Sequence, residues 1–365
     1  MPSRRGVPVQ SFMGRQNHRE AGALRVFTES VAPAEWDSYV DRHPLATAYH
    51  RVSAVLVGRK EFGLDVWFLT AEEDGRIVGL LPLVEQSSLL FGCFLVSLPF
   101  FTYGGILADN DRVAAALSAA AAALGQTRRV DHIELRHRIP LTGLGMPDRL
   151  DKVSLVLSLP ASESELGKRL GSKLRSQIRR AEREDPEVIW GGAELIPDFY
   201  LVFSRSMRDL GTPVYPRGFF ESVCRALEDR VSILVVRVRG QVQAAAIIVR
   251  HGKCIEVPWA AATPDAKRNA INMRMYWELL AFSVRAGAEL FDFGRSTVHS
   301  GTYRFKMQWG AKPMQLYWHY WLPEGHEIPK LNQSNPKYAL AASLWSRMPV
   351  WCANLIGPMI VRNLP

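Results

Sequence analysis

Hydrophobic and polar positions along the chain predict the same order of elements twice. From residue 24 to 160 they indicate strands 24–28, 66–71, 76–84, 89–98, 131–136 and 152–159, with helices 33–42, 51–62 and 111–126. From 161 to 322 they indicate helices 162–184, 196–210, 216–228, 269–286 and 302–309, with strands 187–190, 232–238, 242–250, 254–261, 289–293 and 314–322. Self-similarity of this kind is typical of a duplicated domain. We therefore expect an α+β fold of two tandem units with mixed, largely antiparallel sheets.

The same pattern divides the chain into four segments. We expect residues 1–23 to be a flexible basic arm, because they are polar and aperiodic. Residues 24–160 and 161–329 form the two folded units, and residues 330–365 are a helical basic tail. The boundary lies beside the sequence SESE at 162–165, which suits the start of a new helix.

Composition excludes several classes of protein. Apolar residues make up 47% of 365, which is enough for packed cores and argues against a disordered chain. The apolar run 89–101 is too short to cross a bilayer, and no apolar stretch follows the first arginines as in a secretory signal, so we expect a cytoplasmic protein. Four cysteines and nine histidines show no metal-ligand spacing, and we expect neither a metal nor a bound cofactor.

Positive charge is concentrated in the second part of the chain. Residues 1–160 hold 17 Lys and Arg against 17 Asp and Glu, so the whole net charge of +9 belongs to residues 161–365. Residues 168–183 carry seven basic residues and one acid, and residues after Glu327 carry four basic residues and no acid. Such local surfaces favour phosphate-rich partners, namely a nucleotide, a tRNA, a lipid pyrophosphate or an anionic membrane.

Polar and aromatic side chains gather in the segment 291–313, directly after a predicted strand. Arg295, Tyr303 and Lys306 can be presented from one loop and the helix that it starts, with Tyr303 and Lys306 on one helical face. A lysine there can neutralise a developing oxyanion or a phosphate. The alternative is a solvated helix whose Phe305 and Trp309 belong to the core.

Three motifs resemble the FemAB-related proteins, and more narrowly the subgroup associated with the PEP-CTERM/exosortase exopolysaccharide system. They are GTYRFKMQWGAKP after FDFGRS, the basic helix GSKLRSQIRRAER, and the ending NPKYALAASLWSRMPVWCANLIGPMIVRNLP. The resemblance implies two GNAT-like (acyl-CoA N-acyltransferase) units. It also implies transfer of an acyl or aminoacyl group to an amine of an envelope polysaccharide or peptidoglycan-type precursor, with aminoacyl-tRNA or acyl-CoA as donor.

Site residues follow from the same resemblance. Lys306 with Phe305 matches the Phe-Lys pair of the family motif, which implies a catalytic Lys306, with Tyr303 as an orienting or proton-relay group and Arg295 as a substrate binder. One departure disfavours CoA: the loop 266–272 has no glycine to let the backbone approach a pyrophosphate. Side chains of this loop could still bind a phosphate, namely Lys267, Arg268 and Asn272.

The basic helix offers a second set of candidates. Like charges repeat along its surface and repel one another by a few tenths of a kcal/mol per pair, so a partner anion would offset this repulsion. No aromatic residue lies among them, which favours contact with phosphates over stacking on bases. The candidate phosphate ligands are Lys173, Arg175, Arg179 and Arg180.

Three further candidates lie outside these motifs. Glu256 and Trp259 are on the predicted strand 254–261, which lines the acyl cleft in the GNAT comparison, and Glu256 is either a general base or a structural ion-pair partner. Tyr103, before two glycines, belongs either to a turn or to a substrate-facing loop.

The tail combines tryptophans with basic residues at helical spacing. This suits a peripheral contact of residues 336–365 with the inner face of an anionic membrane, and packing on the second unit is the alternative. The sequence thus predicts an acyl- or aminoacyltransferase. Two alternatives stay open: an acyl-CoA-dependent N-acyltransferase, and a non-catalytic binding module for a polyprenyl-phosphate glycan or RNA.

Overall fold

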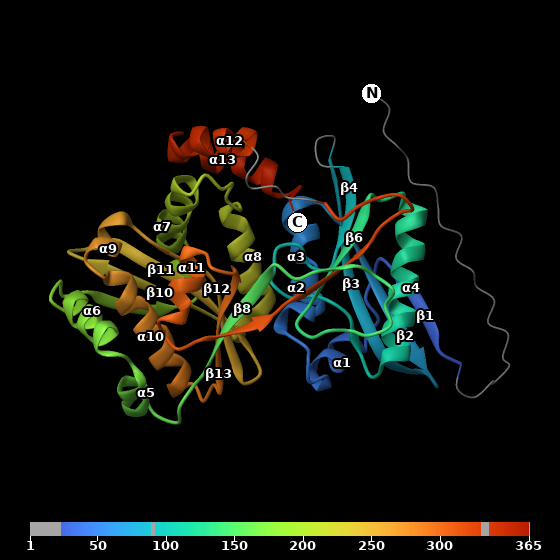
Figure 1. Ribbon diagram of the computed structural model, residues 1–365, viewed down its shortest axis with the longest axis horizontal. Helices are drawn as coiled ribbons and strands as arrows, with labels where there is room; N and C mark the ends of the chain where they lie inside the picture. The colour runs from blue at the N-terminus through green and yellow to red at the C-terminus, as the bar shows by residue number, and fades with distance from the viewer. Residues whose placement is uncertain (1–22, 89–91, 330–335, 365) are drawn as a thin grey trace.

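Two β-sheets, each with helices on both faces, make up the chain (Figure 1). The computed structural model describes residues 23–88, 92–329 and 336–364. The predicted arm at residues 1–23 therefore lies outside the described residues, apart from its last position. The α+β class expected from the sequence is confirmed.

The first sheet has the strand order β1-β2-β3-β4-β6-β15-β7, with β5 paired to β3. Its strands are β1 (Arg25–Glu29), β2 (Asp65–Glu73), β3 (Arg76–Ser88), β4 (Gly92–Val96), β5 (Leu107–Ala108), β6 (His132–His137), β7 (Asp148–Arg149) and β15 (Tyr317–Trp321). Its helices are α1 (Trp36–Arg42), the 3-10 helix η1 (Ala48–His50), α2 (Val52–Val55), α3 (Val57–Phe62) and α4 (Asp111–Arg128).

The second sheet has the order β9-β10-β11-β12-β13-β8-β14. Its strands are β8 (Lys152–Ser158), β9 (Glu187–Gly191), β10 (Val231–Val238), β11 (Gln241–His251), β12 (Cys254–Ala262), β13 (Leu290–Thr297) and β14 (Lys312–Gln315). Its helices are α5 (Glu163–Arg169), α6 (Ser172–Glu182), η2 (Ala193–Leu195), α7 (Ile196–Asp209), α8 (Arg217–Leu227), η3 (Glu228–Arg230), α9 (Pro264–Arg268), α10 (Ile271–Arg285) and α11 (Gly301–Met307).

Both sheets follow one plan, which confirms the predicted duplication. In each sheet the first four strands pair antiparallel, and the fifth strand pairs parallel to the fourth. The sixth and seventh strands again pair antiparallel to their neighbours. The parallel pairs are β4 with β6 and β12 with β13, and each spans three register positions. The two units thus have the same topology despite their different sequences.

In each sheet, the second-to-last strand comes from the part of the chain that otherwise forms the other sheet. Strand β8 precedes residue 160 and lies in the second sheet, whereas β15 comes from the far end of the chain and lies in the first. The predicted strand 314–322 is two strands in different sheets, because the chain turns at the buried Leu316, whose N–H donates to the Lys152 carbonyl at 3.2 Å. The predicted unit limits 24–160 and 161–329 stay a prediction, and strand pairing does not follow them at β8 and β15.

One apolar core continues from the first unit into the second. It includes η1 and the loop after β4 on one side, and α7, α8 and β12 on the other. Phe101 stacks on Tyr49 with ring centroids 4.3 Å apart and also contacts Trp259 at 6.2 Å. A continuous core of this kind fixes the two units relative to each other.

Two predicted helices are each interrupted. The helix expected at 162–184 is divided into α5 and α6, because Leu170 and Gly171 have extended backbone angles (ψ 134° and 155°). The helix expected at 51–62 is divided into α2 and α3 at Leu56.

The tail forms α12 (Pro336–Ser346) and α13 (Val350–Val361), which pack beside α7 (Figure 1). A Cβ atom at Gly357 would lie 2.9 Å from the Val214 carbonyl oxygen, so glycine allows the close approach. The Gln86 side-chain amide donates to the carbonyls of Arg362 at 2.8 Å and Leu364 at 2.9 Å, which ties the tail to the first unit as well. Among the described helices, none is long and apolar enough to cross a membrane.

Candidate active site

The candidate site lies where the parallel strands β12 and β13 separate. Their pairing covers residues 254–256 and 290–292 and then ends. Beyond Glu256, β12 continues beside β11, and beyond Asp292, β13 continues beside β8. Gly294 has a φ of +74°, which only glycine adopts freely, and the β8 register shifts there. Diverging strands expose main-chain groups and side chains that a ligand can reach from the strand ends.

Lys306 directs its ammonium group to this point of separation. It comes from α11, whose first turn is capped by the Ser300 hydroxyl oxygen, which accepts from the Tyr303 N–H at 3.2 Å. The Lys306 ammonium donates to the carbonyl oxygens of Gly294 at 2.8 Å and Arg295 at 3.0 Å. Only 8% of the residue is exposed, and burial lowers the pKa of Lys306 to about 8, against the opposing effect of nearby carboxylates. Within the described chain, one of its three donors is left for another acceptor.

Asp292 joins the two units through its carboxylate. It accepts hydrogen bonds from the hydroxyls of Tyr103 and Ser154 and from the Gly294 N–H, the last at 2.8 Å. Burial, and then the charge of Glu256, raise the pKa of Asp292. Tyr103 lies in the loop after β4, is 2% exposed and reaches Asp292 from the first unit, and its role toward a substrate stays a prediction.

Glu256 is fully buried and also binds groups of the first unit. Its Oε2 accepts from the Tyr49 hydroxyl and from His251 Nε2, both at 2.9 Å. Because His251 Nδ1 accepts the Ala48 N–H at 2.9 Å, the neutral ring carries its proton on Nε2 and donates it to Glu256. The other oxygen, Oε1, is buried and has no hydrogen-bond partner in the described part of the structure. An unpaired buried carboxylate oxygen is costly, which suits a functional group better than a purely structural one.

The first sheet closes the equivalent place with its own side chain. Arg136 lies two residues after Glu134, as Gly294 lies two after Asp292 in the matching register of the second sheet. Its guanidinium donates to the carbonyl oxygens of Pro99 at 2.6 Å and Phe101 at 2.9 Å, and to Glu134 Oε1 at 2.7 Å. The separation in the first sheet is thus bridged by an arginine, whereas in the second sheet a glycine leaves that place without a side chain.

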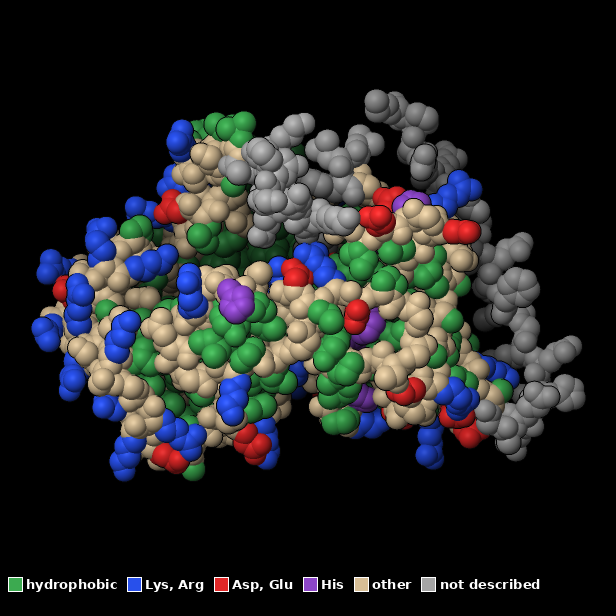
Figure 2. Space-filling view, in the orientation of Figure 1, with side chains coloured by type: hydrophobic (Ala, Val, Ile, Leu, Met, Phe, Trp, Pro, Cys, Tyr) green, Lys and Arg blue, Asp and Glu red, His purple; other side chains and the backbone are tan. Residues whose placement is uncertain are grey.

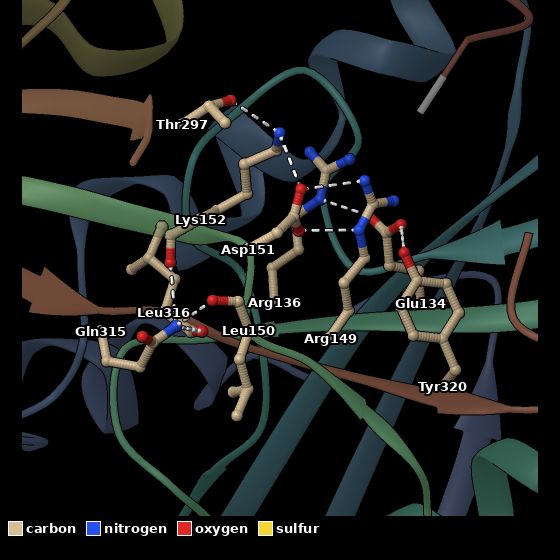
Figure 3. Close-up of polar contacts among 10 residues, drawn as sticks. All are labelled: Glu134, Arg136, Arg149, Leu150, Asp151, Lys152, Thr297, Gln315, Leu316 and Tyr320. Carbon is tan, nitrogen blue, oxygen red and sulfur yellow. Dashed lines mark hydrogen bonds and ion pairs between the residues drawn. The ribbon is translucent and has the colours of Figure 1, made fainter. Parts of the chain in front are cut away.

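A row of ionic contacts connects the two sheets beside the site (Figure 3). Arg149 donates to Asp151 at 2.7 Å, and Lys152 contacts the same carboxylate at 3.0 Å. The Lys152 ammonium also donates to the Thr297 hydroxyl at 2.9 Å, at the end of β13. Figure 3 shows Asp151 between Arg149 and Lys152, so each of these cations has an anionic neighbour.

Arg295 differs from these neighbours because no carboxylate pairs with it among the described residues. Its guanidinium lies 4.9 Å from the centre of the Trp318 ring, which Arg136 also contacts at 4.7 Å. Protein surrounds the group, and burial followed by the charge of Arg136 lowers the pKa of Arg295 to about 10, so it stays charged at neutral pH. The residue nevertheless keeps an exposed surface, as a side chain on the wall of a cleft does. Arg295 is therefore available to an anionic ligand.

Figure 2 shows a hollow on this face of the molecule, with hydrophobic side chains on its floor and basic side chains at its edge. By its place in Figure 1, it lies between α7 and α8 on one side and α11 on the other. The hollow thus opens beside the helix that carries Lys306.

The three aromatic candidates of the predicted site all pack against other aromatic rings. Phe305 contacts the Tyr276 ring edge-on at 4.9 Å, and Tyr303 packs partly buried beside His299 at 5.9 Å. Trp259 is 6% exposed and meets Phe219 and Phe220 edge-on. These three aromatic residues therefore shape the walls of the site, and their roles toward a substrate stay predictions.

The predicted phosphate ligands lie at two exposed places on the second unit. Helix α6 packs on α10. Its exposed side chains include the four predicted ligands Lys173, Arg175, Arg179 and Arg180. The loop 266–272 forms α9 and the start of α10, joined by Ala270 with a φ of +62°. Lys267 and Arg268 are exposed there, Arg268 pairs with Asp265, and Asn272 is half-buried. The structure does not bring these residues together with Lys306.

Sequence reasoning missed Asp292, Tyr49, His251, Arg136 and Trp318. The signal for Asp292 was present, because it precedes Gly294 and Arg295 in the motif. The other four lie far from the motif in sequence, and only the packing of the two units places them at the site. Among the described residues, no group of His, Cys, Asp and Glu is arranged to hold a metal ion.

Comparison with known proteins supports this architecture. Residues 168–307 match the family model of the acetyltransferase (GNAT) domain. A search of curated proteins finds no match. Among solved structures, FemX superposes with a TM-score of 0.65 at 14% identity, covering 87% of this chain and 100% of FemX.

Two further solved structures share the fold. The C-terminal domain of a putative lysylphosphatidylglycerol synthetase from Agrobacterium fabrum has a TM-score of 0.53 at 12% identity, over 84% of this chain and 92% of that domain. A tandem GNAT protein from the clavulanic acid biosynthesis pathway has a TM-score of 0.51 at 12% identity, over 84% of this chain and 100% of that protein. The chain therefore has a tandem GNAT-like fold, and its second unit carries the part that matches the GNAT domain.

Proposed function

We propose that the protein is an acyltransferase that moves an acyl or aminoacyl group to an amine of an envelope polysaccharide or peptidoglycan-type precursor. The observation that carries the proposal is the buried ammonium of Lys306 at the separation of β12 and β13, held by the Gly294 and Arg295 carbonyls with one donor left. The GNAT match over residues 168–307 supports the reaction class.

The proposed reaction is direct transfer without a covalent enzyme intermediate. The acceptor amine attacks the acyl carbonyl, a C–N bond forms, and negative charge develops on the carbonyl oxygen. Lys306 stabilises this oxyanion with its free donor, an effect that is strong in a site that excludes water. As the carbonyl re-forms, the C–S or C–O bond to the donor breaks, and the amine proton passes to the leaving group.

Two groups are candidates for accepting the proton of the amine, and we place them in order. The first is the substrate itself, because Glu256 is fully buried and already binds Tyr49 and His251 through Oε2. The second is Glu256 Oε1, which has no partner within the described structure and would act as a base if the acceptor reached it.

Arg295 is proposed to bind a phosphate or carboxylate of the substrate. The Lys306 ammonium donates to the Arg295 carbonyl oxygen at 3.0 Å, no carboxylate pairs with the Arg295 guanidinium among the described residues, and that guanidinium lies on the Trp318 ring. Arginine recognises phosphate and carboxylate through paired N–H groups. An anion at this place would offset the excess of positive charge.

Two donors remain in competition, aminoacyl-tRNA and acyl-CoA. The glycine-free loop 266–272 disfavours a CoA pyrophosphate, and the exposed arginines of α6 favour a longer polyanion such as tRNA. The names of similar structures do not decide between these donors, since one is a putative lysylphosphatidylglycerol synthetase domain and another is a tandem GNAT protein solved without AcCoA. We place aminoacyl-tRNA first.

A transfer assay that offers charged tRNA and acyl-CoA in parallel, with an RNase control, tests the proposal. We expect Lys306→Ala to lower turnover about 100-fold, because removal of one oxyanion donor typically has an effect of that size. Arg304→Ala is the matched control, since Arg304 is an exposed cation on the same helix, and it should change turnover less than twofold. Full turnover by Lys306→Ala would refute the assigned role, and RNase-insensitive transfer from acyl-CoA would reverse the donor preference.

A non-catalytic binding module is the second candidate function, and the unpaired Arg295 favours it. Such a module would bind a polyprenyl-phosphate glycan or RNA without transferring any group. Binding of these ligands that depends on Arg295, together with no turnover from either donor, would favour this second function.

A further inference from the structure

The tail presents an apolar face to solvent. Five of its side chains are 60–70% exposed and Ile356 is 39% exposed, although all are large and hydrophobic. We call this set the outer tail face, which consists of Leu340, Leu344, Trp351, Leu355, Ile356 and Met359. Figure 2 shows hydrophobic side chains at the top of the molecule, where Figure 1 places α12 and α13. Exposed apolar patches of this kind mark interaction sites in folded proteins.

The large apolar residues recur at helical spacing, so they share one face of each tail helix, and the opposite face packs on α7. Trp351, Leu355 and Met359 are spaced at four residues along α13, and Leu340 and Leu344 are spaced likewise along α12. The buried side of α13 carries Ala353, Gly357 and Val361 at the same spacing. Small residues there allow close contact with Val214, so the large apolar residues are the ones that point outward.

The tail is held firmly in this orientation. The Arg208 guanidinium donates to the Met348 carbonyl at 2.7 Å, between the two helices. A Cβ atom at Gly211 would lie 2.7 Å from the Ala342 carbonyl oxygen, so α12 also approaches the end of α7 closely. The outer tail face is therefore a built surface and does not result from a loosely attached segment.

The charged residues of the tail itself all have one sign. Residues 328–365 contain four basic residues, Lys330, Lys337, Arg347 and Arg362, and no Asp or Glu. Arg347, between α12 and α13, and Arg362, directly after α13, are both exposed. An apolar face with tryptophan, on helices whose own charges are all basic, is typical of segments that lie in the surface of an anionic bilayer.

We propose that the outer tail face docks on an anionic lipid bilayer, with α12 and α13 lying in the plane of the lipid headgroups. Trp351, Leu355 and Met359 would enter the boundary between headgroups and acyl chains, and Arg347 and Arg362 would contact lipid phosphates. This inference rests on the tail alone and does not require the proposed transfer reaction.

A second copy of the chain fits this face less well. A symmetric dimer would place the same surface against itself, which brings Arg347 and Arg362 of both copies together. No acid in residues 328–365 could offset that repulsion. Anionic lipid supplies the missing negative charge and apolar volume together.

Vesicle co-sedimentation of the full-length protein tests the proposal. The probes are vesicles of phosphatidylcholine with 30 mol % phosphatidylglycerol, and vesicles of phosphatidylcholine alone. We expect the protein to bind the anionic vesicles, and we expect the double variant Trp351→Asp with Leu355→Asp to reduce the partition coefficient at least tenfold. Arg347→Gln should reduce it about fivefold, consistent with the contribution of one basic residue near anionic lipid.

Val31→Asp is the matched control, because Val31 is 69% exposed and lies in the first unit, after β1. It should leave vesicle binding unchanged, and circular dichroism should show that every variant is folded. Absence of wild-type binding, or equal binding by the double variant, would overturn the proposal. A dimer in sedimentation velocity that Leu355→Asp dissociates would also overturn it, in favour of a second copy.

Discussion

The buried ammonium of Lys306 predicts a specific pH dependence of stability. Its pKa in the folded protein is about 8, against an ordinary value of 10.5. Between these values the unfolded chain binds more protons than the folded chain, so the free energy of unfolding rises as the pH rises. The variant Lys306→Met lacks this group and therefore lacks this rise.

The size of the effect follows from the shift in pKa. Comparing pH 7 with pH 10, the wild type should gain about 2–3 kcal/mol in free energy of unfolding relative to Lys306→Met. Taking the difference between the two proteins removes the contributions of other titrating groups, including the buried Tyr49 and Tyr103, whose pKa values burial raises well above 10.

Urea unfolding followed by far-ultraviolet circular dichroism at both pH values measures this difference. Lys312→Met serves as the control, because Lys312 is exposed on β14 and its removal should leave the pH dependence of the wild type unchanged. A wild-type to Lys306→Met difference that is equal at pH 7 and pH 10 would refute the reasoning, since it would mean that the ammonium is not held in a low-dielectric place.

Three further predictions concern the site. Turnover should fall as the pH rises through about 8, where Lys306 loses its proton, and Lys306→Arg should move that fall to higher pH; identical pH profiles would contradict the role of the ammonium. Arg295→Gln should raise KM for the phosphate-bearing donor about tenfold with little change in urea midpoint, because no acidic partner is lost within the described chain, and an unchanged KM would argue against anion binding. Gly105→Ala should lower the free energy of unfolding by about 1–3 kcal/mol, since its Cβ would lie 2.2 Å from the His137 ring; a stable Ala variant in urea would contradict this packing.

Local sequence patterns predicted the features that are encoded by residues close together in the chain. The motif around Lys306 led to a side chain whose ammonium reaches the separation of β12 and β13, because a strand, a capped turn and a short helix are all encoded within residues 290–307. The duplication was predictable for the same reason, because the spacing of hydrophobic residues distinguishes each strand from each helix and so gives the order of elements in both units.

Long-range pairing was beyond such patterns. Tyr49 reaches Glu256 across 207 positions, and Ala48 reaches His251 across 203, so neither partner is suggested by its own surroundings. Arg136 read as an ordinary strand residue, although it bridges the separation in the first sheet that Gly294 leaves open in the second. The arrangement of side chains around the site therefore depends on the contact between the two units.

The position of β15 bears on how the protein is made. The first sheet needs residues 317–321 beside β6, so a nascent chain cannot complete that sheet until the ribosome has translated β15. Until then β6 has an unpaired edge, and β8 waits for a partner in β13 that is synthesised more than a hundred residues later. Maturation of the two halves is thus expected to be simultaneous, and a fragment released at residue 160 would be a substrate for chaperones and proteases.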